Sequence, residues 1–221
     1  MSLRVVVWDR TDLGRRRRGH DGARGTANVR LGLAPAWWIG AKLYAFARQV
    51  EGARFFARGV ASFDEAIRFA VACTGRTQSP LTELQMWGHG GFGFMDLGES
   101  RLDRAALAPS HPLAGPLDLL RDALADDGQV WLRCCSSFGG SEGRAFGPAL
   151  AERLGTRVVG HTYVIGAVQS GTHSLSPGEV PMWPVDEGVQ RIDGKTARAK
   201  ASRPGEPNTI GCLRLDLPKG F

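Results

Sequence analysis

Two hydrophobic runs, MWGHGGFG at 86–93 and VWLRCCSS at 130–137, decide how this sequence of 221 residues is interpreted. The first run stops at His89 between glycines, and the second stops at the adjacent thiols of Cys134 and Cys135. Short apolar runs bounded by glycine and polar residues are typical of buried strands. A fold that joins the two strand ends would therefore place an imidazole beside a thiol.

Predicted strands and helices alternate through the rest of the chain. Strands are expected over 3–9, 53–60, 81–89, 129–135, 156–166 and 209–218, and helices over 34–50, 62–75, 115–128 and 141–155. This alternation predicts an α/β fold, a three-layer sandwich with a mostly parallel central sheet. The chain is interpreted as a single domain, 1–221, with a Gly/Arg-rich loop over 9–32 and a Gly/Pro-rich loop over 167–190. Sheets of this kind hold their sites outside the carboxyl ends of the strands, where the two runs stop.

Composition favours a protein of the cytoplasm. The net charge is +6, but much of it lies in GRRRRGHDGARG at 14–25, which we interpret as a solvated loop, so no nucleic-acid partner is expected. No apolar run approaches the roughly 20 residues that span a bilayer, and the first ten residues do not predict a signal peptide. The four cysteines form no CxxC pair, which disfavours structural zinc and favours free thiols in a reducing compartment.

The two strand ends carry the residues of nucleophilic catalysis. A cysteine nucleophile needs a base or an imidazolium that favours its thiolate, and His89 supplies the imidazole. It also needs donors for the oxyanion, and the backbone amides of Gly90 and Cys135 are the expected ones. Because side chains alternate between the two faces of a strand, only one of Cys134 and Cys135 can face His89.

WGHGGFG followed by VWLRCC resembles the caspase-like cysteine peptidases, the caspase–hemoglobinase fold that includes gingipains, metacaspases, separases and CHAT domains. Cys135 follows His89 by 46 residues, near the spacing of about 50 in caspases. The resemblance covers about 81–166 and the first strand. It implies a Cys–His dyad that hydrolyses a peptide or protein substrate without a metal or organic cofactor. A small residue usually precedes the nucleophile in the family, which favours Cys135 over Cys134. The caspase signature Gln-Ala-Cys-x-Gly is absent, since this chain has RCCSS.

Charged residues near the predicted site would set the substrate preference. An acidic pocket would favour a substrate arginine or lysine, and a basic pocket would favour an acidic substrate. The acidic candidates are Asp9, Asp96, Asp186 and Glu187, and the basic candidates are Arg10, Arg133 and Arg144. The sequence does not choose between these two sets.

Two other functions remain open at this point. The chain could be a catalytically inactive caspase-like scaffold or regulatory module, because a fold does not guarantee an activity. It could also be an esterase of the α/β-hydrolase type, since GHGGFG is similar to the oxyanion loop of those enzymes. That fold requires Gly-x-Ser-x-Gly followed by the catalytic histidine, so the base would be His161 or His173, and RCCSSFGG lacks the leading glycine.

Overall fold

The structure is a computed structural model that describes residues 2–13, 32–50, 52–192, 195–214 and 217. The basic segment 14–25, which belongs to the loop predicted over 9–32, lies outside the described residues. The helices are α1 (Ala34–Val50), α2 (Phe63–Thr77), α3 (Ala114–Ala123), α4 (Gly140–Leu154) and the 3-10 turn η1 (Ala105–Leu107). The strands are β1 (Leu3–Asp9), β2 (Arg54–Val60), β3 (Leu81–Trp87), β4 (His89–Gly91), β5 (Phe94–Leu97), β6 (Ser100–Leu102), β7 (Leu124–Arg133), β8 (Arg157–His161), β9 (Val168–Gln169), β10 (Thr172–Leu175), β11 (Val189–Ile192), β12 (Lys195–Ala199) and β13 (Ile210–Gly211).

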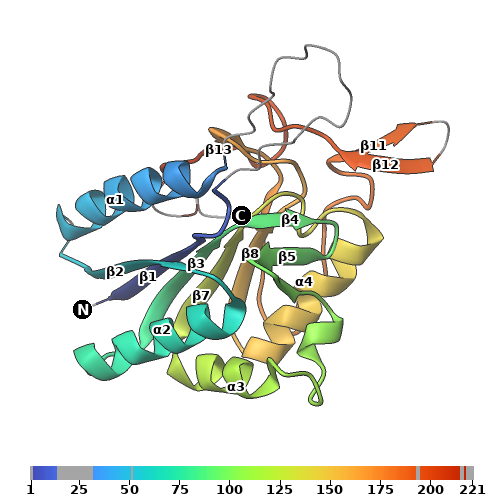
Figure 1. The fold of residues 1–221 in the computed structure, drawn as a ribbon. Coiled ribbons are helices and arrows are strands. Elements are labelled where there is room, and N and C mark those ends of the chain that lie inside the picture. Colours follow the sequence, from blue (N-terminus) through green and yellow to red (C-terminus); the bar gives the residue numbers. More distant parts are fainter. Residues whose placement is uncertain (1, 14–31, 51, 193–194, 215–216, 218–221) are drawn as a thin grey trace, which may run out of the picture.

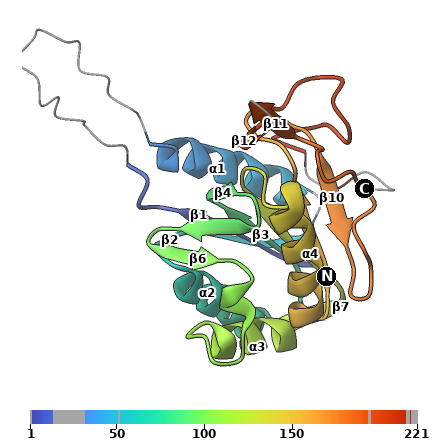
Figure 2. The same cartoon turned by 90° about the vertical axis from the view of Figure 1, so that its right-hand side faces the viewer.

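A six-stranded sheet organises the fold, in the order β10-β8-β7-β3-β1-β2. The five strands from β8 to β2 are parallel, and only β10 pairs antiparallel, with β8. Helix α1 covers one face of this sheet, and α2 and α3 lie on the other (Figure 1). Figure 2 shows the same layers from the side, with the β11–β12 hairpin apart from the main sheet. The prediction of a three-layer α/β sandwich with a mostly parallel sheet is confirmed.

Alternating side chains of the buried strands fill two cores, one on each face of the sheet. On β1, Val5 and Val7 join the larger core, which includes side chains of α2, α3 and α4. Val6 and Trp8 point the other way and pack with α1 around Tyr44. Both faces of β1 are therefore covered, which is why its sequence is a continuous hydrophobic run rather than an alternating one.

Local signals in the sequence set the boundaries of α1 and α2 closely, whereas the helix predicted over 115–128 ends at Ala123 and residues 124–128 belong to β7. The helix predicted over 34–50 is α1, with the same bounds. Helix α2 begins after an N-cap residue at the predicted start, because the Ser62 hydroxyl accepts a hydrogen bond from the Glu65 amide at 3.2 Å. That helix runs past the predicted end at Gly75 to Thr77 and stops at Gln78, which has the left-handed conformation.

Several elements differ from the predictions. The segment 167–190, predicted as a loop, contains β9 and β10, and β10 extends the main sheet. Of the last predicted strand, over 209–218, the described residues form only the two-residue β13, which pairs with β9. Helix α4 begins at Gly140, one residue before the predicted start, and its N-cap residue is Gly139. None of the helices that the structure describes has the length and apolar character needed to cross a membrane.

Candidate active site

The register of two neighbouring strands brings the predicted site residues to one place. Strands β3 and β7 run parallel, and Trp87, the last residue of β3, pairs with Arg133, the last residue of β7. His89 lies two residues beyond the first strand end, and Cys135 lies two residues beyond the second. Because both ends reach the same edge of the sheet, residues separated by 46 positions become neighbours at the carboxyl edge.

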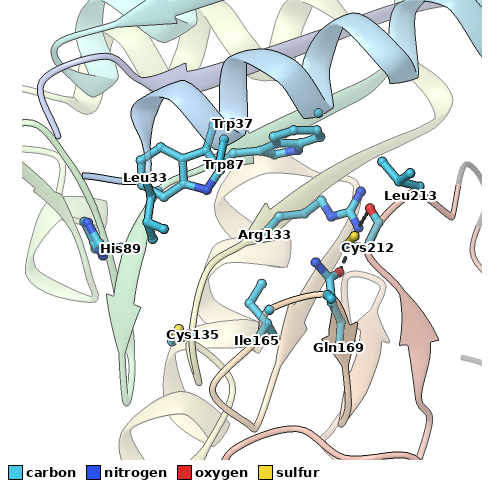
Figure 3. Close-up of a pocket in the computed structure, with 15 residues that line it drawn as sticks. Leu33, Trp37, Trp87, His89, Arg133, Cys135, Ile165, Gln169, Cys212 and Leu213 are labelled. Atoms are coloured by element: carbon cyan, nitrogen blue, oxygen red, sulfur yellow. Dashed lines mark hydrogen bonds between the residues drawn. The ribbon is translucent and has the colours of Figure 1, made fainter. Parts of the chain in front are cut away.

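His89 and Cys135 line the same cavity, which has a volume of about 390 Å³. One wall is formed by α1, which contributes Trp37 and Gly40, and the opposite wall by segments that follow β8, including Ile165. Figure 3 shows His89 and Cys135 on one side of this cavity and the guanidinium of Arg133 on the other. A Cβ on Gly40 would stand 2.9 Å from the Trp87 ring, so α1 lies close against this end of the sheet.

The two adjacent cysteines have different surroundings. Cys134 is 1% exposed, belongs to the larger hydrophobic core and does not line the cavity. Cys135 is partly exposed and points to the other face, as the alternation of side chains requires. Burial raises the pKa of the Cys134 thiol far above its usual range. Of the two thiols, only that of Cys135 is placed to meet a substrate in the cavity.

The Cys135 thiol is protonated at neutral pH in the free protein. Burial raises the pKa of this thiol, and the backbone N–H of Ile165, which hydrogen bonds to the sulfur, only partly offsets the increase. A thiolate–imidazolium pair would need a lowered thiol pKa instead. The site therefore contains a neutral thiol, which must lose its proton to a base when it attacks an electrophile.

His89 is held by a carboxylate that the sequence analysis missed. Its Nε2 lies 2.9 Å from an Oδ2 oxygen of Asp12, and its ring meets the ring of Trp37 edge-on with centroids 5.4 Å apart. Asp12 follows β1, whose carboxyl end lies beside that of β3 in the sheet. An acidic residue just after the neighbouring strand was the available signal, but the separation of 77 positions hid the pairing.

Gly90 lies directly against the cysteine pair. A Cβ at this position would stand 2.7 Å from the Cys134 sulfur and 2.8 Å from the Cys135 carbonyl oxygen. The backbone amides after the thiol are partly occupied, since the Ser136 N–H donates to the Tyr163 carbonyl and the Phe138 N–H donates to the His161 carbonyl. The assignment of the Gly90 and Cys135 amides as oxyanion donors stays a prediction.

The four acidic pocket candidates do not line the cavity. The Asp9 carboxylate is buried and accepts hydrogen bonds from Thr11 and from the Gly98 amide. Asp96 forms an ion pair with Arg101 at 2.8 Å. Asp186 is exposed.

Glu187, the fourth, bonds to Nε2 of His173 at 2.6 Å and to the Thr162 hydroxyl. Its burial would raise the pKa of this carboxyl, but these two hydrogen bonds outweigh burial and lower it. None of the four acidic candidates therefore contributes to the lining of this cavity.

The three basic pocket candidates also differ in whether they line the cavity. Arg10 forms an ion pair with Glu65 at 3.3 Å, and Arg144 donates to the Trp183 carbonyl. Only Arg133 lines the cavity. Of the seven charged candidates, Arg133 is therefore the one that lines this cavity.

The two histidines that an esterase mechanism would need lie away from the cavity lining. His161 is fully buried, accepts from the Trp131 indole at 3.2 Å and contacts the Thr172 hydroxyl, and burial lowers its pKa to about 3. His173 has one ring nitrogen beside Glu187 and the other 3.3 Å from the Asn208 amide. Both imidazoles are therefore occupied by contacts within the fold.

Fold and site together define an α/β protein with a thiol, an imidazole and a guanidinium around one cavity at the carboxyl edge of a mostly parallel sheet. Within the described ranges, no group of three or more His, Cys, Asp or Glu residues is arranged to hold a metal ion. A family model described as a domain of unknown function, DUF4347, matches residues 62–177, more than half of the chain. The chain belongs to the DUF4347 family. No curated protein matches the sequence.

The family segment contains part of the site. His89, Arg133, Cys135 and the Ile165 wall fall within residues 62–177. Asp12 and the whole of α1 lie before it. The reactive groups thus belong to the matched segment, whereas the partner of the imidazole and one wall of the cavity come from the preceding residues.

Proposed function

We propose that this protein is a caspase-like cysteine peptidase, in which Cys135 attacks a peptide carbonyl with the assistance of His89. The observation that carries the proposal is that these two side chains, predicted from two separate strand ends, line one cavity while Cys134 does not. The cavity volume of about 390 Å³ lies within the range of small-ligand pockets and suits a substrate side chain and the adjoining peptide.

The reaction begins from the neutral thiol. His89 accepts the Cys135 proton as the sulfur forms a bond to the carbonyl carbon, and the amides of Gly90 and Cys135 stabilise the oxyanion. The tetrahedral intermediate collapses, the carbon–nitrogen bond breaks, and the imidazolium gives its proton to the departing amine. Water then hydrolyses the thioester, again with His89 as the base. Asp12 holds the imidazole in orientation and stabilises its positive charge while it carries the proton.

The adjacent cysteines provide a matched pair of variants for testing this proposal. Peptide-library cleavage is measured for the wild type, Cys135→Ala and Cys134→Ala, with thermal unfolding as the control for folding. We expect Cys135→Ala to abolish cleavage and Cys134→Ala to retain it, because the second thiol only fills space in the core. His89→Ala should lower the cleavage rate by about 100-fold or more, the scale of general-base catalysis. Cleavage that survives in Cys135→Ala would refute the proposal.

One observation favours a catalytically inactive module, namely the raised pKa of the Cys135 thiol, which lowers its intrinsic reactivity. The same library decides between the two functions. An inactive module would cleave no peptide, and a peptidyl electrophile would label Cys135 no faster than it labels a free thiol in a short peptide. A cytoplasmic location remains part of the proposal, supported by the four free thiols.

A further inference from the structure

Helix α1 is hydrophobic on its solvent-facing side as well as on its buried side. On the buried side, Ala41 and Tyr44 pack against the sheet in the smaller core. The opposite side, which we call the outer face of α1, consists of four large apolar side chains that are 51–71% exposed, Trp38, Ile39, Leu43 and Phe46. A helix that is hydrophobic all round is normally covered on every side. The outer face of α1 is therefore expected to have a binding partner.

The helices on the other side of the sheet place charged residues at their surface. On α2, Arg68 is exposed and forms an ion pair with Asp64 at 2.9 Å, and on α4 the first turn exposes Glu142. The sequence of α1 contains two basic residues, Lys42 and Arg48, and no acidic residue. Figures 1 and 2 show α1 at the surface of the molecule, on the face of the sheet opposite to α2 and α3. The apolar outer face is thus a particular feature of α1.

The positive charge of the chain is concentrated in the sequence around this helix. Residues 10–48 contain nine basic and two acidic residues, a net charge of +7 in a chain whose total is +6. Within the outer face itself, Lys42 is exposed and lies one helical turn from both Trp38 and Phe46. Exposed aromatic and aliphatic side chains beside basic residues are typical of helices that lie in the interface of an anionic bilayer. The apolar groups enter the acyl boundary there, and the cations meet the lipid phosphates.

The size and charge of the outer face disfavour two other occupants. Its four large side chains expose on the order of 400 Å² of apolar surface, about half of the roughly 800 Å² that each partner contributes to a standard protein interface. A second copy seated on it would also bring two basic helices together. A nucleic acid would be attracted by the charge but offers no apolar surface to Ile39 and Leu43. A bilayer supplies both negative charge and an apolar interior, and it needs no groove that matches the helix.

We propose that the outer face of α1 binds the surface of an anionic phospholipid bilayer, with the helix lying along the interface. This inference does not depend on the proposed peptidase function, because it uses the side of α1 that faces away from the cavity. The other side of the same helix contributes Trp37 and Gly40 to the cavity lining. A bound protein would therefore hold its cavity close to the lipid headgroups.

Co-sedimentation with lipid vesicles tests this proposal. The full chain is mixed with vesicles of phosphatidylcholine alone or of phosphatidylcholine with phosphatidylglycerol, and the Kd is obtained from the bound fraction as the lipid concentration rises. Two leucines provide a matched pair of variants, because Leu43 on α1 is 52% exposed and Leu119 on α3 is 46% exposed. Leu43→Gln and Leu119→Gln remove the same apolar side chain from a helix surface. Thermal unfolding followed by circular dichroism is the control for folding.

We expect the wild type to bind the anionic vesicles and to bind phosphatidylcholine alone much more weakly. Leu43→Gln and Phe46→Gln should each weaken binding about 5- to 30-fold, the range expected when a half-exposed or more exposed large apolar side chain no longer enters the bilayer. Leu119→Gln should stay within about twofold of the wild type, because α3 lies on the opposite side of the sheet. Lys42→Gln should weaken binding to the anionic vesicles about fivefold, the contribution of one cation at such a surface.

Absence of binding to the anionic vesicles would overturn the proposal. Unchanged binding by Leu43→Gln and Phe46→Gln would overturn it as well, because the protein would then bind lipid through its charge and without the outer face. Sedimentation velocity without lipid tests for a second copy. A wild-type dimer that Leu43→Gln dissociates and Leu119→Gln retains would show that another chain covers this face instead of a bilayer. If Leu43→Gln does not fold, Phe46→Gln, at the most exposed position of the face, decides the question.

Discussion

The protonation state of Cys135 predicts an unusual pH dependence for its alkylation. Burial raises the pKa of this thiol above its ordinary value of 9.0, so at pH 7 no more than about 1 molecule in 100 carries the thiolate. Only the thiolate reacts with iodoacetamide. We therefore expect the rate of Cys135 alkylation to rise about tenfold for each pH unit from pH 6 to 9, without a plateau.

The assay compares two reactions of one thiol. Iodoacetamide is added under pseudo-first-order conditions across this pH range, and modification is quantified on the peptide that contains Cys135. In His89→Ala the alkylation rate should change little, because the reagent traps a thiolate that forms without the imidazole. Hydrolysis of a cleaved peptide should fall by about 100-fold or more in the same variant, because there the imidazole removes the proton during attack.

A preformed thiolate–imidazolium pair would give the opposite pattern. Alkylation would then level off between about pH 6 and 8, and His89→Ala would abolish the plateau. Either result would refute the conclusion that the free site holds a neutral thiol. A short unstructured peptide with one cysteine serves as the reference, since its thiol titrates without the burial that raises the pKa of Cys135.

Three further predictions follow from single contacts. Gly90→Ala places a methyl group 2.7 Å from the Cys134 sulfur, so it should cost about 1–3 kcal/mol of unfolding free energy in urea denaturation and slow peptide hydrolysis. Gly115→Ala, whose added Cβ meets no atom within 4 Å, is the matched control and should be tolerated. Asp12→Asn should lower kcat about tenfold or more with little change in KM, because it weakens the group that orients the imidazole, and an unchanged kcat would exclude that role. His161 has a folded pKa of about 3, below its ordinary value of 6.5, so its contribution is complete above pH 6.5 and is lost as the pH falls toward 3. Between pH 6.5 and 5 the wild type should lose about 2 kcal/mol more unfolding free energy than His161→Gln, and parallel losses would contradict this.

The sequence was sufficient for the central strands of the sheet and for the two strand ends, because both depend on local patterns, but not for β10, which lies in a segment predicted as a loop. Continuous hydrophobic runs marked β1, β3 and β7 as strands covered on both faces, and strand alternation limited the nucleophile to one of two cysteines. The structure places Cys135 in the cavity and Cys134 in the core, as this alternation requires. Both inferences use periodicities that involve neighbouring residues only.

Contacts between distant segments could not be predicted in the same way. The pairing of Asp12 with His89 depends on β1 and β3 being neighbours, and strand order is a property of the whole sheet. The four acidic pocket candidates were chosen for charge and proximity in sequence, but whether a carboxylate lines a cavity depends on how loops pack. The partners of Arg133 were equally hidden, since Gln169 and Cys212 reach it from segments far along the chain.

The same long-range assembly explains why one guanidinium can be both buried and charged. Arg133 ends a central strand, so α1 and the segments around β9 and β13 enclose it from opposite sides. Its described partners are neutral groups that fix its position, and among the residues that the structure describes no carboxylate forms an ion pair with it. An apolar residue would fill this space without the cost of burying a charge, so packing alone does not account for an arginine here.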